Sequence, residues 1–324
     1  AIAEANKGHA PSYGADAWTQ SLEVRFREIF GPETRAFPVF NGTAANVLSA
    51  AGVIEPHQAV VCAGTSHIHF DECGAIERFA GCRVLALDVA HGKIEPASLA
   101  QVPDGHGMPH QSQPRVLSIT QASELGTVYT PDEVRLLADA AHDRGWLLHM
   151  DGARLANAAA ALDLPLREVT RDAGVDLLSF GGTKCGLLAG EVVLVFAAGL
   201  APHMPYTRKQ GLQLASKMRF LSAQFLALLD DELWRHMAQH ANAMARRLHD
   251  TVRGLPGLQI THPQESNAVF ARLPANALAQ LRQEWRMALW DEAAGEVRWM
   301  ASWDTTPEDV DDFAESIRVA TKDA

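Results

Sequence analysis

Two short stretches of this chain each end an apolar run with glycine and one ionisable group. Residues 147–152, Leu-Leu-His-Met-Asp-Gly, bring Asp151 to the end of a run of strand length, and residues 177–184, Leu-Leu-Ser-Phe-Gly-Gly-Thr-Lys, do the same for Lys184. Ligands of open α/β sheets bind just beyond the carboxyl ends of the strands. An acid and an amine at two such ends could therefore face one ligand. A pyridine aldehyde cofactor needs this pair, since a lysine forms a Schiff base with it and an acid keeps its ring nitrogen protonated.

Each of these two groups also has an ordinary structural interpretation. An acid after a strand can cap the following turn, but Asp151 follows a run that is expected to be buried on both faces, where an unpaired carboxylate is costly. A cationic partner is therefore expected, either a pyridinium N–H or the nearby Arg154. Lys184 could be a surface lysine in a turn. In a partly dry site its amine would have a lowered pKa and could act as a nucleophile.

An anion site is predicted where Asn41-Gly42-Thr43 precedes a helical pattern over residues 44–51. The free N–H groups at a helix N-terminus, together with Gly42 and the Thr43 hydroxyl, can hold a phosphate. The alternative is that Asn41 or Thr43 only caps the helix.

The elements that must position these groups alternate between strand and helix patterns. Strands are predicted at residues 59–62, 84–87, 115–120, 146–150, 175–180 and 192–196. Between two of them, Thr130, Pro131 and Glu133 form the start of a helix with a capping box, which Gly145 ends. This alternation predicts an α/β fold with a mostly parallel, mixed sheet covered by helices.

The pattern of predicted elements changes in the second half of the chain. A helical region is predicted over 212–251, followed by an α+β unit with strands at 258–261, 268–273 and 296–301 and a last helix after Thr306-Pro307. We therefore expect an N-terminal segment (1–20), a large cofactor-binding domain (21–211), a connecting helical region (212–251) and a small C-terminal domain (252–324). The chain begins at Ala1 rather than Met, and we expect part of the N-terminal segment to be missing.

Composition excludes several classes of function. The formal net charge of −11 argues against nucleic-acid partners. No apolar run reaches the roughly 18 residues of a membrane span, and residues 1–20 lack a signal-peptide pattern. The four cysteines form no Cys-x-x-Cys pair, which favours reduced thiols and a cytoplasmic location. His67-x-His69 near Asp71 and Glu72 is the best place for a metal, but no ligand spacing completes a site, and no metal is predicted.

Six motifs occur in the order found in one enzyme family. They are Asn41-Gly42-Thr43-Ala44-Ala45-Asn46, Ser66-His67 through Asp71-Glu72-Cys73-Gly74-Ala75, Thr120-Gln121-Ala122-Ser123-Glu124, His149-Met150-Asp151-Gly152-Ala153-Arg154, Gly181-Gly182-Thr183-Lys184, and Ser216-Lys217-Met218-Arg219-Phe220. With them, the chain resembles the pyridoxal-phosphate enzymes of fold type I, and within these the low-specificity L-threonine aldolases and phenylserine aldolases. The resemblance covers residues from about 13 to 298.

The resemblance implies roles at the cofactor. Lys184 would carry pyridoxal 5'-phosphate as a Schiff base, and Asp151 would pair with the pyridine nitrogen. His67 would stack on the ring, and Gly42 and Thr43 would hold the phosphate. Lys184, His67 and Asp151 are thus the expected catalytic residues.

The resemblance also implies contacts to the substrate and to a second subunit. Arg154 would lie near both cofactor and substrate, and Arg298 would grip the substrate carboxylate, for which a planar guanidinium is well suited. Asp71 would contact the substrate. Lys209 and Arg219 would reach the phosphate of a neighbouring subunit, in a homodimer or homotetramer whose sites lie between subunits.

The implied reaction is cleavage of L-β-hydroxy-α-amino acids, such as threonine, allo-threonine and phenylserine, to glycine and an aldehyde. Many relatives have a histidine in the loop where this chain reads Gln121-Ala122-Ser123-Glu124, so the base for the β-hydroxyl stays open between His67, a bound water and a carboxylate such as Asp71. The family's N-terminal Ser-Asp segment is absent, and Cys185 stands where asparagine commonly follows the lysine. The alternatives are a β-eliminating lyase or transaminase of the same fold, or a non-catalytic binding protein.

Overall fold

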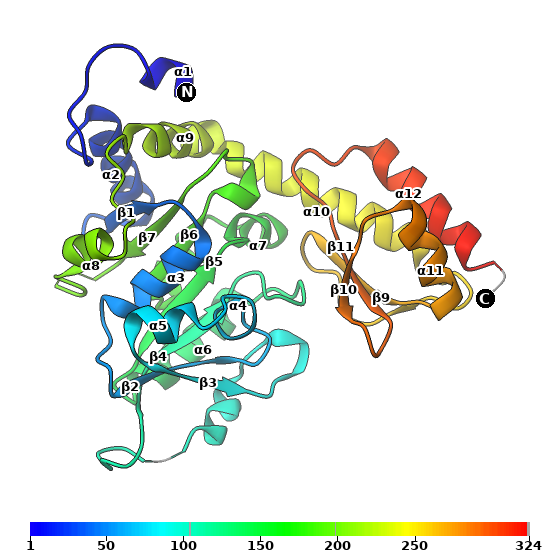
Figure 1. Ribbon diagram of the computed structural model, residues 1–324, viewed down its shortest axis with the longest axis horizontal. Helices are drawn as coiled ribbons and strands as arrows, with labels where there is room; N and C mark the ends of the chain where they lie inside the picture. Colours follow the sequence, from blue (N-terminus) through cyan, green and yellow to red (C-terminus); the bar gives the residue numbers. More distant parts are fainter. Residues whose placement is uncertain (104, 198, 323–324) are drawn as a thin grey trace.

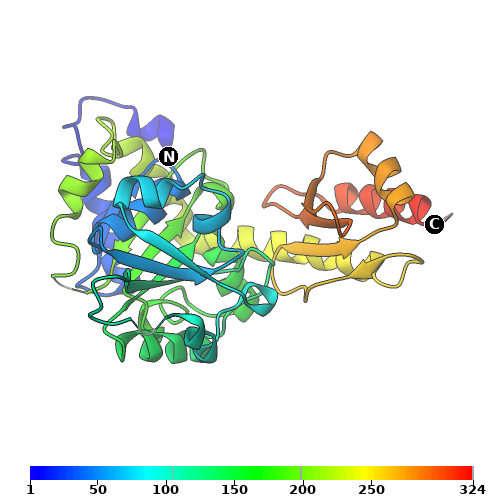
Figure 2. The same cartoon turned by 60° about the horizontal axis from the view of Figure 1, so that its bottom comes forward.

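Two β-sheets, joined by one long helix, organise the chain (Figure 1). The computed structural model describes residues 1–103, 105–197 and 199–322. The larger lobe is built on a seven-stranded sheet of order β1-β7-β6-β5-β4-β2-β3, and the smaller on a four-stranded sheet of order β10-β11-β9-β8. The helix α10 (Leu233–Val252) runs from one lobe into the other, and the smaller lobe stands to one side of the larger (Figure 2).

The large sheet is mostly parallel, as the sequence predicts. Its strands are β1 (Arg35–Val39), β2 (Gln58–Ala63), β3 (Arg83–Leu87), β4 (Gln113–Thr120), β5 (Leu147–Gly152), β6 (Leu177–Gly181) and β7 (Glu191–Val195). Strands β2 to β6 pair in parallel, and β7 runs antiparallel to both β6 and β1. The centre of this sheet is buried on both faces, which is why its strands read as continuous apolar runs.

Nine helices in the described residues accompany this sheet. They are α1 (Ile2–Ala5), α2 (Ala17–Phe30), α3 (Gly42–Ala51), α4 (His67–Phe70), α5 (Ala75–Ala80), α6 (Pro131–His142), α7 (Leu155–Leu162), α8 (Met204–Gln210) and α9 (Arg219–Leu229). The capping box predicted at Thr130 and Glu133 is present at the start of α6, and Asn41 caps α3 by accepting from the Ala44 N–H. Both caps satisfy N–H groups that the first helical turn leaves free.

The helical region begins later than the sequence predicts. Leu212 has a φ of 62°, a left-handed conformation that a helix does not continue, and α9 starts only at Arg219. A second break separates α9 from α10, because Asp231 and Glu232 also have positive φ. The prediction of one helical run from residue 212 was therefore wrong at its start and in its continuity.

The smaller lobe packs a sheet against three helices. Its strands are β8 (Gln259–Ile260), β9 (Ala268–Arg272), β10 (Ala288–Asp291) and β11 (Glu296–Met300), and its helices are α10, α11 (Ala275–Glu284) and α12 (Pro307–Ala320). Thr306 caps α12 as expected. Strand β10, like β1, was not among the predicted strands. The lobe has its own apolar cluster, separate from that of the large sheet, while the division into four segments stays a prediction.

No helix in the described part of the chain is long and apolar enough to cross a lipid bilayer.

Candidate active site

The two stretches that open the sequence analysis lie side by side in the sheet. Strands β5 and β6 are parallel neighbours, with Asp151 opposite Ser179, so Asp151 and the turn that carries Lys184 lie at the same sheet edge. Gly181 makes this approach possible: a Cβ atom there would lie 2.5 Å from the Ala153 carbonyl oxygen. Close packing against the neighbouring chain segment, rather than the geometry of a turn, therefore requires glycine at the end of β6.

Asp151 is buried, and its partners are amides rather than an arginine. Its Oδ2 accepts a hydrogen bond of 2.8 Å from Asn46 Nδ2, and its Oδ1 accepts one of 3.0 Å from the Ala153 N–H. Within the described residues, Arg154 forms no ion pair with it. The sequence expectation left a pyridinium N–H or Arg154 as the cationic partner, and the second of these is not what the fold provides.

Asn46 links Asp151 to a second buried acid and to His67. The same Nδ2 donates to Glu72 Oε1 at 2.9 Å, and that oxygen lies 2.9 Å from His67 Nδ1. The hydrogen bond with Glu72 raises the pKa of His67, although burial acts the other way. The imidazole is thereby biased towards its charged form, in which both ring nitrogens are donors.

Glu124 holds the backbone of His67. Its Oε1 accepts from the His67 N–H at 2.9 Å and from the Thr120 hydroxyl at 2.8 Å. The carboxyl is buried, and burial, helped by the charge of Asp151, raises its pKa to about 7. A carboxyl with such a pKa can exchange a proton near neutral pH.

Lys184 stands among charged groups. Desolvation, followed by the positive charge of Arg154, lowers the pKa of Lys184, while Asp151 and Glu191 oppose this shift. No partner for its amine is found in the residues the structure describes. The lowered pKa leaves more neutral, nucleophilic amine at neutral pH than an ordinary lysine has.

Two arginines approach from different elements. Arg154 precedes α7, and burial, followed by the charge of Arg298, lowers its pKa to about 10. Arg298 comes from β11 of the smaller lobe. Burial lowers its pKa, while the negative charges of Asp71 and Glu124 in the larger lobe act to raise it. Its buried Nε has no partner in the described residues. The arrangement brings a guanidinium from each lobe to one side of the site.

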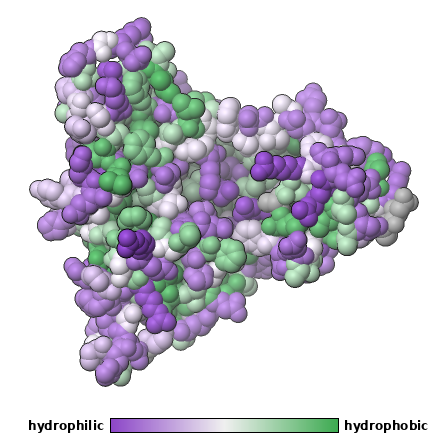
Figure 3. Space-filling model, in the orientation of Figure 1, coloured by the Kyte–Doolittle hydropathy of each residue, from purple (hydrophilic) through white to green (hydrophobic). Residues whose placement is uncertain are grey.

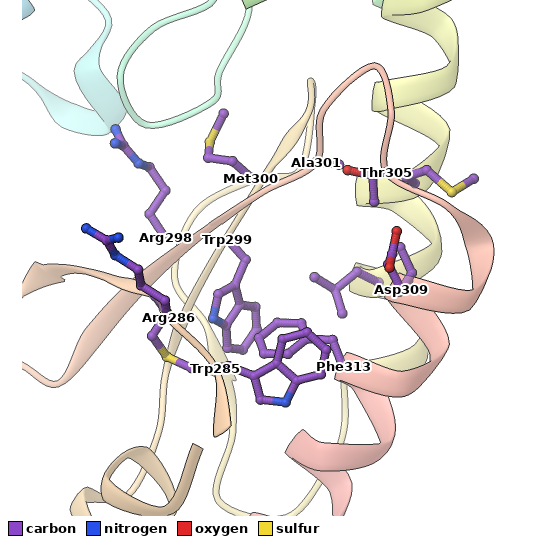
Figure 4. Close-up of a pocket in the computed structure, with 13 residues that line it drawn as sticks. Trp285, Arg286, Arg298, Trp299, Met300, Ala301, Thr305, Asp309 and Phe313 are labelled. Atoms are coloured by element: carbon purple, nitrogen blue, oxygen red, sulfur yellow. The ribbon is translucent and has the colours of Figure 1, made fainter. Parts of the chain in front are cut away.

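Arg298 lies at the edge of an apolar groove but points out of it. The groove, about 370 Å³ in volume, lies in the smaller lobe among Trp285, Trp299 and Phe313. Figure 4 shows the Arg298 side chain leading away from these rings, towards the cyan ribbon of the larger lobe. Its carbon stem is therefore anchored by the small lobe, and its Cζ lies 5.0 Å from the centre of the Trp290 ring.

The remaining predicted residues lie in three places. Gly42 and Thr43 are the first residues of α3, and a Cβ added at Gly42 would meet no atom within 4 Å, so the space in front of this helix end is open. Lys209 and Arg219 make no contact with Lys184 in the described part of the chain: Lys209 lies over the Tyr13 ring, and Arg219 donates to the Gly8 carbonyl. Asp71 is exposed beside α4.

Sequence reasoning assigned no role to Asn46, Glu72 or Glu124. A signal for Asn46 exists: Asn46 and Ser49 are polar residues three apart in a helix that is otherwise apolar after Thr43, and this spacing places them on one face. In the fold that face meets the strand ends, where Ser49 lies 3.4 Å from Ser179. Neither acid lies in such a pattern, and their hydrogen bonds to Asn46 and to the His67 N–H join residues 26 and 57 positions apart.

No group of three or more potential metal ligands occurs among the residues described.

Comparison with known proteins identifies the family. The family profile described as beta-eliminating lyase matches residues 1–276. A low specificity L-threonine aldolase of Pseudomonas aeruginosa is 43% identical over 321 residues, covering 98% of this chain and 92% of its own length, and one of a Pseudomonas species is 42% identical over 320 residues, with 98% and 92% covered.

A solved structure agrees with these sequences. The threonine aldolase of Leishmania major is 27% identical, covers 98% of this chain and 94% of its own, and superposes with a TM-score of 0.92. The expected fold type I architecture is thus confirmed. The chain belongs to the beta-eliminating lyase family and, within it, to the low-specificity L-threonine aldolases.

Proposed function

We propose that this protein cleaves L-β-hydroxy-α-amino acids to glycine and an aldehyde, with pyridoxal 5'-phosphate as cofactor. The observation that carries the proposal is the pairing of Asp151 and Lys184 at the ends of adjacent parallel strands in a chain of this family. Threonine and allo-threonine are the proposed substrates, together with phenylserine and its analogues.

The residues present fit the cofactor. The open N-terminus of α3 at Gly42 and Thr43 supports a phosphate site, because helix N-termini bind phosphate through free N–H groups. Asp151, held by two donors, is poised to accept a further hydrogen bond from a pyridinium N–H. His67, fixed at its ring nitrogen by Glu72, would lie on the ring face, and Lys184 would hold the aldehyde carbon. Bound pyridoxal phosphate supplies a sink for the electron pair released at the substrate Cα.

The protein's own residues bind and orient the substrate. Arg298 and Arg154 would hold its carboxylate, and the unpartnered Nε of Arg298 supports this role, since a buried guanidinium N–H without an acceptor is costly. Asp71, whose charge acts on Arg298, would contact the substrate on the same side. Holding the carboxylate from two lobes fixes which bond of Cα is aligned for cleavage.

The surface supports a homo-oligomer. Phe70, Phe79, Tyr206 and Leu212 are each at least 67% exposed, and apolar patches gather over α3, α4 and α5 on the face shown in Figure 3. Phe79 and Leu212 also line a hollow of about 460 Å³ in front of the α3 N-terminus. We propose a homodimer or homotetramer that covers this face, with Lys209 and Arg219 reaching the phosphate bound by the partner subunit. We also propose a cytoplasmic location for the protein, because its four cysteines are free thiols.

A product assay tests the proposal. Threonine, allo-threonine and phenylserine should each give glycine and the matching aldehyde in equal amounts. Release of pyruvate and ammonia would point to a β-eliminating lyase instead, and a transferred amino group to a transaminase.

Borohydride labelling tests the cofactor site. Reduction should abolish the visible absorbance and leave the label on Lys184, while Lys184→Ala should abolish turnover. An unlabelled Lys184, or an active Lys184→Ala protein, would contradict the assignment. A protein that binds no cofactor would favour the non-catalytic alternative.

A further inference from the structure

Glu124 is a buried acid to which the proposed function gives no role. It lies in the loop after β4, and only 7% of its surface is exposed. One carboxyl oxygen is fully engaged, since Oε1 accepts from both the His67 N–H and the Thr120 hydroxyl. The other oxygen, Oε2, is buried and has no partner within the described residues.

A carboxyl that is anchored by one oxygen and bare at the other is unusual for a structural residue. Buried polar atoms are nearly always hydrogen-bonded, because an unmade hydrogen bond costs about 1–3 kcal/mol. A purely structural acid at this position could be a glutamine with no loss at Oε1. The bare Oε2 therefore calls for a partner that the chain itself does not provide.

The charges around Glu124 place it in the proposed substrate site. The charge of Asp151 in β5 acts on Glu124, and the charge of Glu124 acts in turn on Arg154 before α7, Arg298 on β11, Cys62 on β2 and Tyr129 in the same loop. Two of these are the arginines assigned to the substrate carboxylate. Burial and the Asp151 charge hold the pKa of Glu124 at about 7, so the carboxyl is present in both protonation states near neutral pH.

We propose that Glu124 is the base that takes the proton of the substrate's β-hydroxyl group through its free Oε2. This rests on the proposed function. The β-hydroxyl O–H bond breaks and its proton moves to Oε2. The oxygen electron pair forms the aldehyde C=O bond as the Cα–Cβ bond breaks, and the pair of that bond stays with Cα. Cα then takes up one proton to become glycine. One proton is therefore removed from the substrate and one is added, and no further reagent is needed.

The other available groups are poorer bases. His67 is held at Nδ1 by Glu72, and this hydrogen bond raises its pKa, so the ring is biased towards the protonated form. Asp71 is exposed, and an exposed carboxylate is well solvated by water. Glu124 combines burial, a free oxygen and a pKa near the working pH, which is the optimum for general base catalysis.

Glu124→Gln is the appropriate test because it is nearly isosteric. The amide oxygen can still accept from the His67 N–H and the Thr120 hydroxyl, while the protonatable Oε2 is lost. Two reactions of the holoenzyme are compared: cleavage of phenylserine, which needs hydroxyl deprotonation, and exchange of the glycine α-hydrogen with deuterium oxide, which does not. We expect kcat/KM for cleavage to fall about 100-fold or more, with glycine exchange changed less than about threefold.

The pH dependence gives a second readout. Wild-type cleavage should lose rate below neutral pH as a carboxyl becomes protonated, and this acidic limb should be absent from the residual rate of Glu124→Gln. In the cofactor-free protein, labelled with carbon-13 at glutamate carboxyls, one signal titrating at about 7 should vanish in Glu124→Gln. Burial also raises the pKa of Glu191 to about 7, so its signal is identified in the same way with Glu191→Gln.

The outcomes separate the hypotheses. Equal loss of cleavage and exchange in Glu124→Gln would overturn the proposal and make Glu124 a positioning residue for His67. Unchanged cleavage, or an unchanged acidic limb, would also overturn it. Failure of the wild-type protein to form glycine from any β-hydroxy amino acid would instead refute the proposed function.

Discussion

Asn46 is the residue whose loss should reveal most about how this site is held together. Its single amide nitrogen donates to Asp151 Oδ2 at 2.8 Å and to Glu72 Oε1 at 2.9 Å, and Asn46 is only 3% exposed. Hydrogen bonds to charged groups contribute about 1.5–3 kcal/mol each. Asn46→Ala should therefore lower the free energy of unfolding by up to about 3–6 kcal/mol, less whatever water recovers in the space left behind.

The measurement is urea unfolding of the cofactor-free protein at one fixed concentration, so that neither cofactor loss nor subunit dissociation enters the comparison. Ser49→Ala is the matched control. It removes a buried polar group one helical turn away on the same face, where the hydrogen bond is neutral and 3.4 Å long. A neutral hydrogen bond contributes about 1 kcal/mol.

Asn46→Asp is a second test, because it keeps the shape of the side chain but replaces the donating amide with a carboxylate. It places a third carboxylate against Asp151 and Glu72, and like charges in a buried site raise each other's pKa. We expect it to be at least as destabilising as Asn46→Ala at pH 8, with the difference shrinking towards pH 5 as carboxyls become protonated. If Asn46→Ala costs no more than Ser49→Ala, or if Asn46→Asp is neutral at pH 8, the bridging role is refuted.

Three further perturbations follow from the same geometry. Gly181→Ala would set a Cβ 2.5 Å from the Ala153 carbonyl oxygen, so we expect the free energy of unfolding in urea to fall by about 1–3 kcal/mol and cofactor binding to weaken. Unchanged cofactor binding would show that this close contact between the strand ends does not position the cofactor site. Burial lowers the pKa of His149 from 6.5 to about 4, so the unfolded chain binds its proton first as the pH falls. The wild type should therefore lose up to about 1.4 kcal/mol per pH unit across that interval relative to His149→Gln, and parallel pH profiles would contradict this. Arg298→Lys keeps the charge but loses the planar fork, so KM for threonine should rise about tenfold, and kcat should fall as well because the bond to be broken is less well aligned; an unchanged KM would argue against carboxylate binding.

The sequence predicts the parts of this fold that local patterns encode. Apolar runs of strand length, the capping box at Thr130 and the cap at Thr306 each depend on residues a few positions apart, and each is found as expected. Strand β1 was missed because Pro38 interrupts its apolar pattern, a residue that an edge strand tolerates. The break at Leu212 was missed because a left-handed leucine has no sequence signature.

The site divides in the same way. Asp151 and Lys184 could be predicted as a pair, because each follows its own strand and neighbouring parallel strands end at one edge. The bridge through Asn46 could not, because its two hydrogen bonds join residues 26 and 105 positions apart. Such contacts depend on how α3 packs across the strand ends, which no local pattern specifies.

The charges at this site explain why it tolerates several buried acids. Asp151, Glu72, Glu124 and Glu191 lie near four cationic or proton-binding groups, namely Lys184, Arg154, Arg298 and His67. Burial raises the pKa of both Glu124 and Glu191 to about 7, and the charge of Asp151 adds to the shift at Glu124. Of these two, Glu124 has a buried oxygen, Oε2, without a partner in the described residues, whereas Glu191 Oε2 accepts from the Gly182 N–H. A buried carboxyl with a pKa near neutral pH and a free oxygen is the kind that a proton-transfer step requires.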